Sequence, residues 1–297
     1  MKEIKLANRF IFWLLMYEII MKFIFELIKL NIKSMFLLQV IFMFMPITFY
    51  FLITREKIFD VIKIKKVSKK NICILILLAF VIQPVMNFFA VLGDLFAKNQ
   101  NKIQDLLNII LENNLLVSIF LFALIPAVLE EVIFRGIFFF GYRKTNPITK
   151  AIFINALAFA ALHLNFQQFF YAFVMGGIFC LIDFSLDSII PSMLLHFIFN
   201  ATQVIKAYFC ANKFSINRFN KFYNLSDIFI QKNNISIFLS AFLISLIFFP
   251  ISMYLLGILT RDFKNKTITD NYVHTSARQL FTWSLIFYFA ICFIFMI

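Results

Sequence analysis

Long apolar runs dominate the chain and alternate with short segments that hold most of its charge. A helix that crosses the ~30 Å hydrocarbon core of a bilayer needs about 20 mostly apolar residues. A helix of a water-soluble protein shows an apolar stripe on one face instead. The pattern therefore predicts membrane-spanning helices, which lie near residues 10–28, 35–54, 72–95, 115–141, 150–165, 167–184, 188–208, 235–259 and 280–297.

The first of these runs differs from the others. Glu18, Lys22, Glu26 and Lys29 recur at about four-residue intervals, so they fall on one face of a helix. A helix of this kind suits the membrane surface at least as well as the membrane interior. We therefore predict an all-α, polytopic membrane helix bundle of about eight transmembrane helices, or nine if the first run crosses.

Composition and charge agree with a membrane protein. Hydrophobic residues make up 62% of the 297 positions and charged residues 14%, which is more apolar surface than a soluble domain of this size needs. The net charge of +13 comes from Lys and Arg between the apolar runs, so it indicates topology and not nucleic-acid binding. The positive-inside rule favours a cytoplasmic N-terminus. We expect a multi-pass protein of the cell membrane.

Three ionisable residues interrupt one apolar run. An ionisable side chain at the centre of a membrane helix costs about 2.5 to 3.5 kcal/mol, so Glu130, Glu131 and Arg135 need a physical reason. Glu131 and Arg135 are four residues apart and share a helix face, and pairing offsets much of that cost. Glu130 points about 100° away from the pair. It is the carboxylate left over for chemistry, and a general base is the role that fits.

Two later spans also hold polar side chains. His163 lies near the outer end of its span, four residues after Phe159. His196 and Asn200 are four residues apart on one helix face, so an imidazole and an amide can converge on a single oxygen atom. The chain has only three His in total, and two of them lie in apolar spans beside other polar groups.

Together these residues form three motifs, in the order EExxxR, FxxxH and HxxxN, on three separate spans. This arrangement resembles the type II CAAX prenyl endopeptidases and the bacteriocin-processing or abortive-infection (Abi, CPBP) membrane proteins. The resemblance covers about residues 115–205. The motif residues are Glu130, Glu131 and Arg135, then Phe159 and His163, then His196 and Asn200.

The resemblance implies an intramembrane endopeptidase that needs no cofactor and no metal. Its substrate would be a membrane-associated protein or peptide in the lipid bilayer, and no nucleic acid would take part. The implied roles meet in a buried cavity: Glu130 as the base that activates a water, His163 as the residue that positions the water, His196 and Asn200 as the oxyanion site, Glu131 and Arg135 as structural support, and Phe159 as packing.

The same reading divides the chain into three parts. Residues 1–114 supply N-terminal membrane helices and a basic cytoplasmic loop, residues 115–205 the catalytic core, and residues 206–297 a C-terminal loop and further membrane helices. Within the first part, residues 98–114 are expected to form a short amphipathic helix on the outer surface. We find no internal repeat and no separate soluble domain.

Two other readings remain open at this stage. In the first, Glu130, His163 and His196 bind zinc in a membrane metalloprotease. The HExxH motif of such enzymes is absent, and Asn200 is a poor zinc ligand. In the second, the chain is a non-enzymatic transporter or immunity protein. Transporters commonly show repeated halves, which this sequence lacks.

A second group of polar residues lies on the third expected span. Gln83, Asn87 and Asp94 share one face, which indicates interior polar packing or, in the functional version, a cavity that admits water or substrate. Pro84 is expected to kink this helix. Asn155, two turns before His163, is a candidate supporting partner of that histidine.

Overall fold

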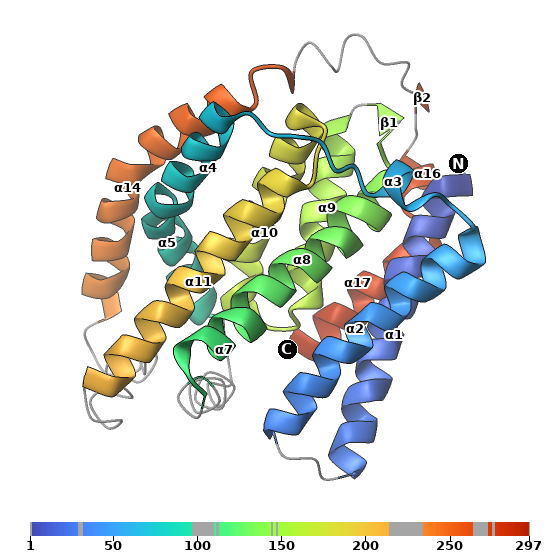
Figure 1. Ribbon diagram of the computed structural model, residues 1–297, viewed down its shortest axis with the longest axis horizontal. Helices are drawn as coiled ribbons and strands as arrows, with labels where there is room; N and C mark the ends of the chain where they lie inside the picture. Colours follow the sequence, from blue (N-terminus) through green and yellow to red (C-terminus); the bar gives the residue numbers. More distant parts are fainter. Residues whose placement is uncertain are drawn as a thin grey trace.

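The chain folds into a bundle of helices in the computed structural model (Figure 1). Two strands of two residues each, β1 (Thr145–Asn146) and β2 (Val273–His274), form a small parallel pair beside it. The structure describes residues 2–28, 32–96, 110, 113–143, 145–146, 148–213, 234–263, 273–274 and 277–296. The amphipathic helix expected at 98–114 falls almost wholly outside these residues.

Helices occupy every apolar run of the sequence. They are α1 (Lys2–Leu27), α2 (Ile32–Thr54), α4 (Lys69–Val81) with α5 (Gln83–Asp94), α7 (Leu115–Ile119) continuing through η1 (Phe120–Leu124), α8 (Ile125–Glu131) and η2 (Val132–Phe138), then α9 (Ile148–Leu162), α10 (Phe166–Leu186), α11 (Ile190–Lys213), α14 (Asn234–Leu259) and α17 (Trp283–Met296). Two short helices, α3 (Ile58–Val61) and α16 (Ala277–Leu280), lie in the connections.

Several helices have the length and composition of membrane spans. Among the described residues these are Leu115–Phe138, Phe166–Leu186 and Ser236–Leu259, or four spans if the bent pair α4 and α5 counts as one. The helices α9 and α17 are apolar but shorter, and α1 and α11 are not in this group. The prediction of a helical integral membrane protein is confirmed, whereas the number of eight transmembrane helices stays a prediction.

The third expected span is broken in the middle. α4 and α5 meet at Ile82 and are bent by 41° relative to each other. Pro84 lies in the first turn of α5, where the backbone N–H that proline lacks is not needed for a hydrogen bond within the helix. If α4 and α5 were one continuous helix, the same position would need that N–H as a donor. The kink expected at Pro84 is therefore present.

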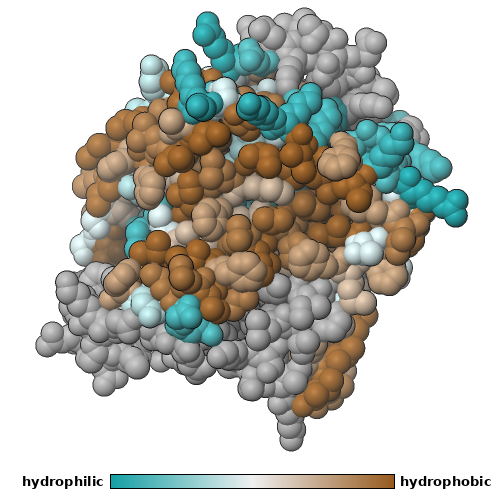
Figure 2. Space-filling model, in the orientation of Figure 1, coloured by the Kyte–Doolittle hydropathy of each residue, from teal (hydrophilic) through white to brown (hydrophobic). Residues whose placement is uncertain are grey.

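The surface of the bundle is mostly apolar. Hydrophobic residues cover most of the face in Figure 2, and hydrophilic ones gather along its upper edge, where the segment between α3 and α4 and the N-terminus lie. The orientation predicted from the sequence places both of these segments in the cytoplasm, and it stays a prediction. Exposed lysines of the edge are Lys57, Lys65, Lys66, Lys69 and Lys70.

Helix α10 lies inside the bundle and packs against α5, α9 and α11. Two glycines allow these close contacts. A Cβ at Gly93 of α5 would overlap the carbonyl oxygen of Phe166, and one at Gly176 would come within 3.1 Å of the Cα of Ala156 on α9. Small residues at helix crossings are the usual way for membrane helices to approach closely.

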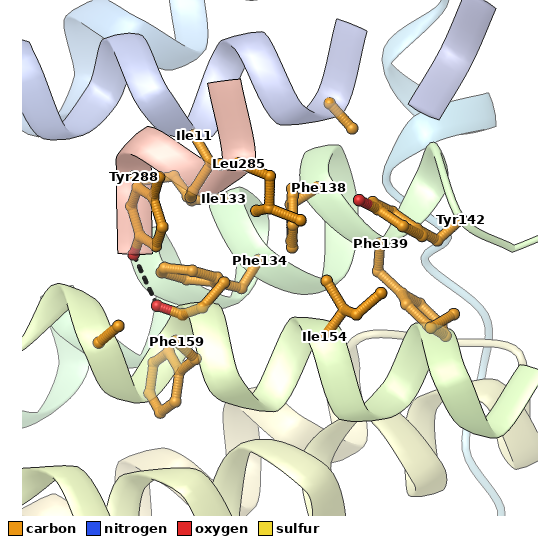
Figure 3. Close-up of a cluster of buried hydrophobic side chains, with 14 of the residues drawn as sticks. Ile11, Ile133, Phe134, Phe138, Phe139, Tyr142, Ile154, Phe159, Leu285 and Tyr288 are labelled. Atoms are coloured by element: carbon orange, nitrogen blue, oxygen red, sulfur yellow. Dashed lines mark hydrogen bonds between the residues drawn. The ribbon is translucent and has the colours of Figure 1, made fainter. Parts of the chain in front are cut away.

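The two ends of the chain cover the other side of the central helices. Figure 3 shows the shared core, in which Ile11 of α1 and Leu285 of α17 lie with Phe134 and Phe138 of η2. The hydroxyl of Tyr288 on α17 donates to the carbonyl of Ala158 at 2.7 Å. The helices that flank the motif-bearing region are thus part of its core, and the division of the chain into three parts stays a prediction.

Candidate active site

The helix that carries the first motif changes its winding at the motif. Glu131 ends α8, and the next residues form the π-helical segment η2, which contains Arg135. Short π-helical segments inside α-helices often occur at functional sites. Nη1 of Arg135 donates to Oε1 of Glu131 at 3.2 Å, and both side chains are fully buried. The two residues predicted to share a face are therefore an ion pair.

Aromatic rings surround the charge of Arg135. Its guanidinium carbon lies 4.3 Å from the ring centre of Phe159 and 5.0 Å from that of Phe179. Nη2 donates to the carbonyl oxygen of Gly176 at 3.3 Å. A cation held over aromatic faces and away from water gains about 2 kcal/mol or more from each favourable ring. Phe159, predicted to pack near the site, thus packs on the arginine.

Glu131 also reaches the third motif. Its Oε1 accepts a second hydrogen bond, from Nδ1 of His196 at 2.9 Å. The His196 ring stacks on Phe179, with ring centres 5.2 Å apart and planes 25° apart. Because the ionised carboxylate of Glu131 only accepts, the proton of the neutral imidazole is on Nδ1. The other nitrogen, Nε2, lies 3.9 Å from Oε2 of Glu130.

His163 is held at a sharp turn that follows α9. Leu164 has a φ of 52°, a left-handed conformation that non-glycine residues seldom adopt. Asn165 then starts α10 by accepting from the backbone N–H of Gln168 at 3.0 Å. Nδ1 of His163 donates to the carbonyl of Phe159 at 2.9 Å, so Nε2 carries the lone pair of the neutral ring. Both site histidines therefore use Nδ1 to fix their rings.

Glu130 and Asn200 are less enclosed than the groups around Arg135. The side chain of Glu130 is 21% exposed, and its carboxylate lies within electrostatic reach of His163 and of Tyr171 on α10. Asn200 is half-buried, one turn beyond His196 on α11. In the part of the chain that the structure describes, the Asn200 amide makes no side-chain hydrogen bond. Its N–H groups are thus available to a ligand.

Three residues near these groups were not predicted from the sequence. Phe179 contacts both Arg135 and His196, Gly176 accepts from Arg135, and Tyr171 lies near Glu130. Phe179 and Gly176 carry no signal in an apolar span, because such residues are common there. The hydroxyl of Tyr171 was the one polar feature that could have been noticed.

Asn155 does not support His163. Its amide donates to the carbonyl of Phe134 at 2.7 Å, and its oxygen accepts from the thiol of Cys180 at 3.0 Å. The residue links three helices inside the bundle instead. The prediction failed because the spacing along α9 gives the distance between Asn155 and His163 but not the direction in which each side chain points.

The polar residues of the third expected span do not share one environment. Nε2 of Gln83 donates to the hydroxyl of Thr202 at 2.6 Å, and its oxygen accepts from Lys206 at 2.7 Å and from Gln203 at 3.3 Å. These bonds join the kink to α11, which is the interior polar packing that the sequence indicates. Asn87, by contrast, is exposed.

The zinc alternative requires at least three ligand side chains grouped around one metal ion. Over the described ranges, no three His, Cys, Asp and Glu side chains are grouped so that they could hold one metal ion. The residues of that alternative, Glu130, His163 and His196, are near one another, but the structure does not arrange them as a ligand set.

A comparison with protein-family models identifies the family of the region that carries the three motifs. Residues 112–202 match the model of the family described as type II CAAX prenyl endopeptidase, Rce1-like. This segment is a domain of the CAAX protease family. The Rce1-like domain covers less than a third of the chain and contains all three motifs. No curated protein and no solved structure matches the chain.

The match supports a CAAX-type membrane protease in the general sense. This confirms the resemblance seen in EExxxR, FxxxH and HxxxN. The match does not extend to the bacteriocin-processing or abortive-infection branch, which stays a prediction. The catalytic class, the roles of the individual residues and the substrate belong to the proposal that follows.

Proposed function

We propose that the Rce1-like domain hydrolyses a peptide bond of a membrane-associated protein or peptide, with Glu130 as general base. The observation that carries the proposal is the different state of two adjacent carboxylates. Glu131 is fully buried and bonded to Arg135 and His196, whereas Glu130 is partly exposed and faces Nε2 of His196. Only the second is available to take a proton from water.

The first chemical step uses Glu130 and His163. A water bound between them gives one proton to the Glu130 carboxylate, and the second O–H donates to Nε2 of His163. The lone pair of that nitrogen is available because Nδ1 donates to Phe159. The hydroxide oxygen then bonds to the carbonyl carbon of the substrate. The proton held by Glu130 passes to the leaving amine nitrogen, so the step needs no covalent enzyme intermediate.

The oxyanion of the tetrahedral intermediate is the task of α11. The amide of Asn200 donates an N–H without any proton transfer, and donors of this type typically contribute about 10² to 10³ in rate. His196 has only Nε2 to offer, because Nδ1 donates to Glu131. Donation from Nε2 to the oxyanion requires a proton on that nitrogen as well.

The substrate is proposed from the family name and the apolar surroundings. The matched family is named for endopeptidases that act on prenylated proteins. Large exposed side chains on the described helices, such as Phe249 and Tyr254 of α14, indicate that lipid surrounds the bundle. A peptide reaches the site most readily if a lipid anchor or an apolar segment holds it in the membrane.

The test compares two glutamates in the purified protein. Wild type, Glu130→Gln and Glu56→Gln are placed in lipid nanodiscs and given quenched fluorescent peptides with and without a prenyl group. Glu56 is exposed on the hydrophilic edge, which makes it a matched control. We expect cleavage by wild type and by Glu56→Gln, and a fall of at least about 10² to 10⁴ in kcat for Glu130→Gln.

Two outcomes would replace the proposal. If Glu130→Gln cleaves as fast as wild type, Glu130 is not the base. If a chelator abolishes activity and added zinc restores it, with one zinc bound per protein, the zinc reading takes over. Comparative peptidomics of membranes that contain wild type or Glu130→Gln identifies the natural substrate, and an immunity or transport protein would leave the two peptide sets alike.

A further inference from the structure

The proposed mechanism gives no task to the hydroxyl of Tyr171, whose side chain hydrogen-bonds that of Gln168. Tyr171 lies on α10, the helix that also supplies Phe179 to the ring of His196. α10 and α11 run antiparallel, joined by a short turn (Figure 1). Eight residues before Phe179, two turns back along α10, Tyr171 is therefore opposite a later part of α11. That part contains Phe199 and Asn200.

Contacts place the Tyr171 ring against Phe199, the neighbour in sequence of the proposed oxyanion residue Asn200. Its ring centre is 6.1 Å from that of Phe199, the residue directly before Asn200. The side chain is only partly exposed and packs against both of the large apolar cores. On the third side, the Glu130 carboxylate lies within its electrostatic reach. The ring is thus held against the helix of the proposed oxyanion donor and within electrostatic reach of the proposed base.

We infer that the hydroxyl of Tyr171 is a further catalytic residue, which donates a hydrogen bond to the carbonyl oxygen of the substrate beside Asn200. The inference rests on the proposed function. A phenol O–H is a strong donor, and a ring fixed by packing keeps it aimed without reorganisation during the reaction. A second neutral donor stabilises the oxyanion without any proton transfer.

The kinetic test removes only the hydroxyl. Tyr171→Phe keeps the ring on Phe199, and Tyr254→Phe is the matched control because Tyr254 is 70% exposed on α14. We expect kcat to fall about 10- to 100-fold in Tyr171→Phe, with KM changed little and thermal stability unchanged. Tyr254→Phe should equal wild type. A purely structural role would lower stability and leave kcat unchanged, which would overturn the inference.

A double-variant cycle tests whether the two donors act on one atom. If Tyr171 and Asn200 share the oxyanion, Tyr171→Phe combined with Asn200→Ala should lose less activity than the product of the two single losses. Strictly multiplicative losses would place the hydroxyl elsewhere and contradict the shared oxyanion.

A measurement without catalysis separates this inference from the proposed function. 3-Fluorotyrosine is incorporated at position 171 or 254, and the ¹⁹F signal is compared in wild type and in Glu130→Gln. We expect a shift at 171 and none at 254. If no peptide is cleaved by wild type, the proposed function fails, while the fluorine signal still reports whether the ring faces Glu130. An unchanged signal at 171 would overturn the inference by itself.

Discussion

Two groups of paired charges, one inside the bundle and one at its hydrophilic edge, differ in more than their position. Glu131 and Arg135 are 3.2 Å apart with both side chains fully buried. At the edge, Asp187 accepts from Lys63 at 2.6 Å and from Lys65 at 2.5 Å, with side chains 28%, 35% and 62% exposed. The shorter pairs are the ones that water can replace.

The comparison shows that burial and not distance decides what each pair contributes. Water and salt screen the edge pairs, so each stabilises the fold by about 0 to 1 kcal/mol. No water can solvate the remaining charge of the buried pair, so removing one partner leaves an uncompensated charge in an apolar interior. Removal of either charge alone is therefore costly, and the pair holds His196 in place through Glu131.

Arg135→Ala is expected to have the largest effect on stability. It leaves the Glu131 carboxylate buried without its cation, at a cost of about 3 to 5 kcal/mol. The yield of folded protein and its melting temperature in detergent measure this. Normal stability with lost activity would show that Arg135 acts in the chemistry and not in the fold.

A double variant provides the control for that prediction. Glu131→Leu with Arg135→Met removes both charges, and replacement of a buried pair by apolar residues of similar volume is often neutral. We expect stability to return toward wild type while activity stays low, because His196 has lost the acceptor of its Nδ1–H.

Phe179→Leu is expected to have an intermediate effect. It keeps an apolar side chain but removes the ring from Arg135 and from His196. The lost cation–π contact, which is shielded from water, should lower stability by about 2 kcal/mol. Because the ring also orients His196, kcat should fall as well. A variant with lower stability but unchanged kcat would limit Phe179 to the support of Arg135.

Asp187→Asn should change stability by at most about 1 kcal/mol at neutral pH. Burial by itself would raise the pKa of Asp187, but the hydrogen bonds and charges of Lys63 and Lys65 together outweigh it, and the pKa is lowered. A lowered pKa means that the stabilisation is present above the ordinary value of about 3.9.

Acid and salt titrations check the edge pairs. As the pH falls below about 4 and through the lowered pKa, the difference between wild type and Asp187→Asn should shrink and vanish. High salt should reduce the same difference at pH 7, but leave the effect of Arg135→Ala unchanged because the buried pair is not screened. A salt-insensitive Asp187 effect would contradict the comparison.

Glu130→Gln is expected to have the smallest effect on stability, within about 0.5 kcal/mol of wild type. Glu131→Gln, one position later, should be clearly less stable because it removes the partner of Arg135. Thermal unfolding of the two variants side by side measures the contrast. Equal losses would mean that both carboxylates support the fold, and would weaken the case for Glu130 as the base.

Many features of the fold and of the site could be predicted from the sequence. The helices follow the apolar runs, because any long stretch without charge must form a helix in lipid to satisfy its backbone. The pairing of Glu131 with Arg135 followed from a spacing of four residues. The kink at Pro84 followed from the missing N–H of proline. The motifs of the three spans also predicted the CAAX protease family.

Only the tertiary structure determines which residues of the site contact one another. Spacing could not show that Glu131 bridges Arg135 and His196, that Phe179 stacks on the imidazole, or that Asn155 turns away to Phe134. These contacts join residues from different helices, and they depend on the π-helical turn at Arg135 and on the close crossing at Gly176. A sequence pattern predicts which residues of one helix share a face. The partner on a neighbouring helix depends on how each helix is rotated and how closely the two helices approach each other.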